Sequence, residues 1–190
     1  MRPLDCATAL LLALCAAGEA NAGDRTATDA PFGLAWGKLD MVPRPTLVDR
    51  EANVTGLIYL RGQAPATGRD TLEVVLEVCR EEGLQQVVWV SRAFPDAERS
   101  EVYANIHREG IDRHGQPRPG PFAGSLRWPE AGVTLAIRHV AGQGSQIIMA
   151  SEGPGYAACS ERHRAEVGHP ASEHVVKLIE DVGMPPETGR

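Results

Sequence analysis

The sequence lacks several features on which common functional classes depend. Its 190 residues include only three tryptophans, three tyrosines, three phenylalanines and four cysteines. Beyond residue 22, no apolar run approaches the ~20 residues that a membrane-spanning helix requires. The net charge is slightly acidic, −6 at pH 7, and the basic residues are scattered. Because nucleic-acid binding requires a clustered basic surface, we expect no nucleic-acid partner. Because no later apolar run is long enough, we expect no membrane span in the mature chain.

Recognisable catalytic signatures are also missing. The chain has no Gly-x-Ser-x-Gly, P-loop or paired-carboxylate motif. The glycine-rich segment 142–145 is followed by neither a lysine nor a predicted helix, so it indicates a hairpin turn and not a phosphate-binding loop. No internal repeat of 20–50 residues is present. These absences favour a non-enzymatic protein, for which we expect no cofactor.

The first 22 residues have the pattern of a signal peptide. Arg2 precedes an apolar run from Ala7 to Ala17, and Ala20-Asn21-Ala22 supplies the small residues that signal peptidase accepts. Cys15 follows a leucine, whereas lipid attachment requires a small residue there, so we favour cleavage over lipidation. We therefore expect a periplasmic or secreted protein with a signal peptide (1–22), a disordered N-terminus (23–30) and a single α+β domain (31–190).

Cleavage would leave two cysteines, Cys79 and Cys159. An even pair in an exported chain predicts one disulfide, joining the first hairpin to the C-terminal segment. Two alternatives compete for Cys159. It could act as a nucleophile with His163 as its base, which requires a free thiol.

A metal cluster is the second alternative for this cysteine, because Cys159, His163, His169 and His174 offer enough ligands for zinc. Their spacing matches no zinc-binding motif, and Pro170 interrupts the helical phase that would align them. We therefore expect no metal and predict that these histidines lie exposed on surface helices.

Periodicity predicts the order of the elements. Segments of alternating apolar residues indicate strands, and apolar residues at helical spacing indicate helices. Strands are expected at 31–42, 54–61, 72–79, 86–94, 126–128, 133–140 and 146–151. Helices are expected from Asp96, as a cap, to Gly115, and at about 157–167 and 171–182. In the strand 72–79, Glu73 and Glu77 fall on the face predicted to be mostly wet.

This order predicts an α+β fold with two layers. We expect a mainly antiparallel sheet, made of two hairpins and the N-terminal strands, with a central helix and C-terminal helices packed on one face. The leading functional hypothesis is an exported, non-enzymatic domain that binds a protein or an envelope component. Alternatives are a small-molecule or metal-binding protein and, third, a hydrolase.

The tryptophans provide the one weak indication of a binding surface. Trp36 is flanked by Gly33 and Gly37, and such a setting suits a residue that lines a ligand or partner groove. Trp89 and Trp128 are predicted to be core or half-buried strand residues.

Overall fold

A computed structural model describes residues 29–40 and 42–182 of the chain, with side chains as far as Lys177. The predicted signal peptide and the segment 23–28 lie outside the described residues. Asp29 and Ala30 lie within them, and Ala30 is buried.

Within this part of the chain, eight strands form a single antiparallel sheet in the order β1-β2-β3-β4-β8-β7-β6-β5. The strands are β1 (Leu47–Glu51), β2 (Val54–Leu60), β3 (Thr71–Cys79), β4 (Gly83–Ser91), β5 (Arg118–Pro119), β6 (Leu126–Trp128), β7 (Val133–Val140) and β8 (Gly144–Glu152). The sheet is thus two four-stranded meanders joined edge to edge where β4 pairs with β8.

Three α-helices pack on the sheet of the described chain, as the sequence predicted for an α+β fold. They are α1 (Asp96–His114), α2 (Tyr156–Val167) and α3 (Ala171–Val182). Short 3-10 helices lie at Pro31–Gly33 and Pro129–Ala131. None of the helices in residues 29–40 and 42–182 is long and apolar enough to cross a membrane.

The helices lie on opposite faces of the sheet, and not on one face as expected. Val74 pairs with Trp89 and Trp89 with Met149, so these side chains share the face that we call the α1 face. Val75 and Val88 point the other way, to the α3 face. Each half of the sheet nevertheless has two layers, one of strands and one of helix.

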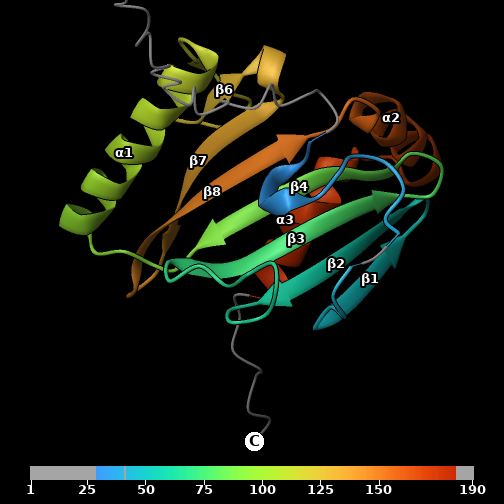
Figure 1. The fold of residues 1–190 in the computed structure, drawn as a ribbon, viewed down its shortest axis with the longest axis horizontal. Coiled ribbons are helices and arrows are strands. Elements are labelled where there is room, and N and C mark those ends of the chain that lie inside the picture. The colour runs from blue at the N-terminus through green and yellow to red at the C-terminus, as the bar shows by residue number, and fades with distance from the viewer. Residues whose placement is uncertain (1–28, 41, 183–190) are drawn as a thin grey trace, which may run out of the picture.

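On the α3 face, Val175 of α3 packs against Ile58, Val75, Val88 and Val90. Burying a valine side chain contributes about 1.5–3 kcal/mol. Figure 1 shows α3 behind the strands β3 and β4, and the N-terminal segment, in blue, in front of them. The N-terminal segment therefore covers the α1 face of the first meander.

Most of the predicted elements are found near their expected places, but several details differ. The strand expected at 86–94 runs from Gly83 to Ser91, and the short strand β5 was not predicted. The segment 31–42, predicted as a strand, contains a 3-10 helix and joins the sheet only through an isolated bridge from Gly37 to Leu84. The short edge strand β1 was not predicted, because most of its side chains are exposed. Asp96 is the first residue of α1 and not its cap, because the N-cap position is Pro95, and no side chain caps the helix there.

Candidate functional site

A groove with a volume of about 1530 Å³ lies on the α1 face, between the N-terminal segment and α1. All three tryptophans of the chain line it: Trp36, Trp89 and Trp128. The sequence singled out Trp36 alone for this role. It missed the other two because the placement of α1 beside the N-terminal segment depends on the order of the strands.

Apolar side chains from several strands, from α1 and from the N-terminal segment line the groove. Trp89 and Met149 lie on its floor, on β4 and β8, while Val102 and Ile106 face it from α1. The indole nitrogen of Trp89 donates to Thr71 Oγ1 at 2.8 Å. Because its one polar group is already bonded, Trp89 can contact a ligand only through the apolar surface of its ring.

Two glycines allow the tryptophan rings to approach the backbone closely. A Cβ atom on Gly110 of α1 would lie 2.6 Å from the ring of Trp128, and one on Gly153 would lie 2.8 Å from the ring of Trp36. Trp128 also donates its indole N–H to the carbonyl of Gly115, just after α1, at 2.8 Å. A glycine inside a helix lowers the stability of the helix. At position 110, the close packing of the Trp128 ring explains why a glycine is present.

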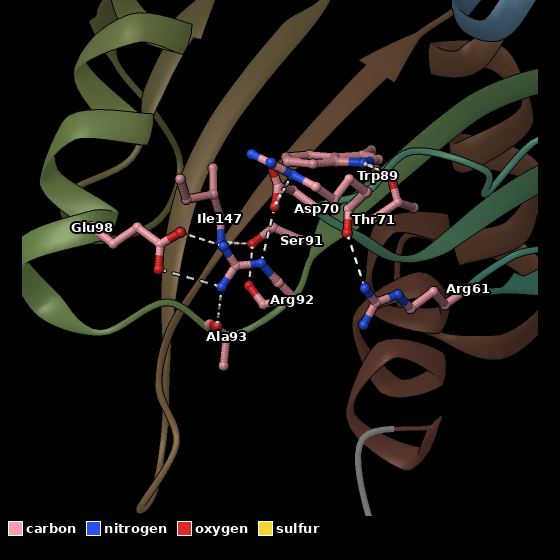
Figure 2. Close-up of polar contacts among 10 residues, drawn as sticks. Arg61, Asp70, Thr71, Trp89, Ser91, Arg92, Ala93, Glu98 and Ile147 are labelled. Carbon is pink, nitrogen blue, oxygen red and sulfur yellow. Dashed lines mark hydrogen bonds and ion pairs between the residues drawn. The ribbon is translucent and has the colours of Figure 1, made fainter.

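A polar network at one end of the groove holds α1 to the sheet. Figure 2 shows Arg92, which follows β4, between Asp70 and Glu98. Arg92 Nε donates to Asp70 Oδ1 at 2.9 Å, and the guanidinium lies 4.2 Å from the centre of the Phe94 ring. Asp70 also lines the groove, so this network lies at the groove's edge and links it to the first turn of α1.

Beneath the helices of the α3 face, the structure buries two carboxyl groups that the alternation pattern had placed on a wet face. Glu73 is 1% exposed and Glu77 is 0% exposed, and the carboxyl oxygens of both have no hydrogen-bond partner. Burial raises the pKa of Glu73 to about 7, against a smaller lowering by Arg138. Burial, followed by repulsion from Glu152, raises the pKa of Glu77 well above its usual value.

The predicted disulfide between Cys79 and Cys159 is present. The two Cα atoms are 6.1 Å apart, which is within the range for disulfides, and the bond ties α2 to the end of β3. Cys159 therefore carries no free thiol. Neither a Cys159–His163 nucleophile pair nor a metal cluster that includes Cys159 is available in the oxidised protein.

The three histidines of the considered metal cluster do come together, but around Glu51 and not around Cys159. Glu51 Oε2 lies 3.4 Å from His163 Nε2 and 3.1 Å from His174 Nδ1, and Glu51 Oε1 lies 3.6 Å from His169 Nε2. His163 is 0% exposed and His174 is 2% exposed. The prediction that these two histidines are exposed is thus wrong.

The error has a physical cause in the short α2–α3 connection. After α2 ends at Val167 with Gly168 as its C-cap, the chain turns at Pro170, and α3 comes back beside α2. Pro170 breaks the helical phase, as expected, but the turn it permits folds His169 and His174 toward His163. Burial lowers the pKa of His174, although the nearby Glu51 carboxylate opposes this.

Sequence reasoning also missed Glu51, the last residue of β1, and Asn53, which lies in the tight turn between β1 and β2. Asn53 is only 6% exposed; its amide nitrogen donates to the carbonyl of Cys159 at 3.1 Å, and its Oδ1 lies 3.1 Å from His163 Nδ1. The sequence offered one signal, an asparagine two residues after a glutamate and directly before a strand. Its buried position rests on the disulfide and α2, which are distant along the chain.

Comparisons of this chain with protein-family models, with curated proteins and with solved structures find no match.

Proposed function

We propose that this chain is an exported, non-enzymatic protein whose tryptophan-lined groove binds an apolar segment of a partner polypeptide. The observation that carries the proposal is the convergence on one groove of Trp36 and Trp89, both partly exposed, with Trp128 buried in its wall, from three distant parts of the chain. A disulfide-bonded fold with no helix that could span the membrane, in the described residues, is compatible with export.

The size and the chemistry of the groove favour a polypeptide over a small molecule. Its volume of about 1530 Å³ exceeds the ~300–1,000 Å³ of most small-molecule sites. Aromatic residues and methionine are enriched at the centres of protein interfaces, and here Trp36, Trp89 and Met149 line the groove. Apolar walls beside a helix suit the binding of an amphipathic or extended segment, as in other groove-binding proteins.

A photo-crosslinking amino acid in place of Val102, on the groove wall, tests this proposal in the protein's native extract. The same amino acid in place of Val48, exposed in the edge strand β1, serves as the control. We expect a polypeptide adduct from position 102 alone. Mass spectrometry of the adduct identifies the partner.

A matched pair of variants then separates the groove from the rest of the surface. Ile106→Glu places a charge in the groove wall, and we expect it to lower the adduct yield at least 10-fold. Ile137→Glu places the same charge at an exposed position of β7, and we expect no change. Circular dichroism checks that both variants fold. Identical adducts from positions 102 and 48, a bound small molecule in place of a polypeptide, or equal yields from the two variants would each contradict the proposal.

A further inference from the structure

We propose that Glu51, His163 and His169 form a binding site for a divalent transition-metal ion of the zinc type. This site is independent of the groove, since its residues lie at the end of β1, in α2 and in the α2–α3 turn, on the α3 face. One ligand atom from each of the three residues lies within 4.8 Å of the other two. Three residues from three elements thus converge on one point.

A hydrogen-bond acceptor lies beside Nδ1 of each histidine, which leaves Nε2 as the nitrogen that can bind a metal. The amide nitrogen of Asn53 donates to Cys159, so the oxygen of Asn53 faces His163 and accepts a hydrogen bond from His163 Nδ1. His169 Nδ1 lies 3.3 Å from the carbonyl oxygen of Pro170, which can only accept. Metal-binding histidines are typically oriented in this way by an acceptor on the nitrogen that does not bind the metal.

Both Nε2 atoms therefore point toward the Glu51 carboxylate. His163 Nε2 is fully buried, has no hydrogen-bond partner and lies 3.4 Å from Glu51 Oε2. A buried imidazole nitrogen that faces a carboxylate at this distance needs a proton or a metal ion between the two groups. A metal ion held by the carboxylate and both imidazoles would take the place of that proton and satisfy the buried nitrogen.

The separations fit a zinc ion. Ligand atoms about 2.0–2.1 Å from a tetrahedral zinc ion lie about 3.3 Å from one another. Here His163 Nε2 lies 3.4 Å from Glu51 Oε2 and His169 Nε2 lies 3.6 Å from Glu51 Oε1, so each imidazole is near this spacing from one carboxylate oxygen. Two nitrogens and one carboxylate oxygen suit Zn²⁺, whereas Ca²⁺ and Mg²⁺ require oxygen ligands.

The residues around the proposed site orient the Glu51 carboxylate and leave a path for an ion from solvent. His174 Nδ1, 3.1 Å from Glu51 Oε2, positions the carboxylate from the buried side. The side chains of Glu51 and His169 are each 30% exposed, so an ion can enter from solvent. The set leaves a fourth coordination position for water or another ligand on this exposed side.

Zinc titration of the tag-free, chelator-treated protein with its disulfide intact tests the site, with a chromophoric chelator as competitor. We expect one Zn²⁺ per chain, and we expect that Ca²⁺ does not displace it. His169→Ala should lower the zinc affinity at least 100-fold. His139→Ala, at an exposed histidine of β7, should leave it unchanged.

Glu51→Gln provides a second variant at a half-exposed position, so the test does not depend on the folding of a single variant. It keeps the shape of the side chain but removes the charge, and we expect at least a 10-fold loss of affinity. The proposal is overturned if the wild-type protein binds no zinc, or if His169→Ala and His139→Ala bind it equally. It is also overturned if zinc binds only after reduction, since Cys79, Glu82 and Cys159 would then be the ligands.

Discussion

Replacing either Cys79 or Cys159 with alanine should lower the free energy of unfolding by about 4 kcal/mol. The bond closes a loop between residues 80 positions apart, and the chain-entropy model gives about 4.5 kcal/mol for a loop of this length. Domains of this size are stable by only ~5–15 kcal/mol, so the loss is a large share of the total. Urea denaturation monitored by circular dichroism measures it directly.

The matched comparison is between the two single variants and the double variant. If the sulfurs act only as a pair, Cys79→Ala, Cys159→Ala and the double variant all lose a similar amount of stability. Reductant in the denaturant should then destabilise the wild-type protein and none of the variants. A free-thiol count on the oxidised wild-type protein should give none from these two residues. A selective loss in Cys159→Ala, with no loss in Cys79→Ala, would show that Cys159 has a role outside the disulfide.

Loss of the disulfide should affect the histidine cluster as well as the stability of the fold. The backbone carbonyl of Cys159 accepts the hydrogen bond that orients Asn53, and Asn53 in turn contacts His163. Loss of the disulfide leaves α2 held by weaker contacts, chiefly to α3. The bond therefore stabilises the arrangement of buried polar groups as well as the attachment of α2.

Local patterns in the sequence predicted the regular elements well. The segment Ala171–Val182 is helical with the predicted bounds, and Val133–Val140 is a strand, because each has a strong apolar period of its own. The disulfide was also predictable, since exported chains rarely leave a pair of cysteines unpaired.

The sequence could not show the contacts between residues that are distant along the chain. His163 looks like a polar residue on a helix of weak amphipathicity, and only the approach of β1 and of the α2–α3 turn buries it. Trp89 and Trp36 come together in one groove because of the strand order. In β3, alternation correctly placed Glu73 on the opposite face to Val74, but could not show that α3 and its neighbours cover that face.

Because Glu73 is buried, replacing it with glutamine should stabilise the protein at pH 8 by about 3 kcal/mol and have little effect at pH 4. The carboxyl has a pKa of about 7 in the folded protein, against 4.5 for the unperturbed group. Between these two values the folded state binds more protons than the unfolded state, so the free energy of unfolding falls as pH rises. Each unit of difference corresponds to about 1.4 kcal/mol, and the loss is complete above pH 7.

Denaturant unfolding of both proteins at pH 4, 6 and 8 measures this difference. Glutamine matches the shape of the protonated carboxyl, so at pH 4 the two proteins should have nearly equal stability. The variant should keep part of the pH dependence, because the raised pKa of Glu77 acts in the same direction. Glu101→Gln, at an exposed position of α1, is the control and should not change the pH dependence. If Glu73→Gln is no more stable than the wild type at pH 8, the Glu73 carboxyl is ionised without cost, and α3 does not exclude water from it.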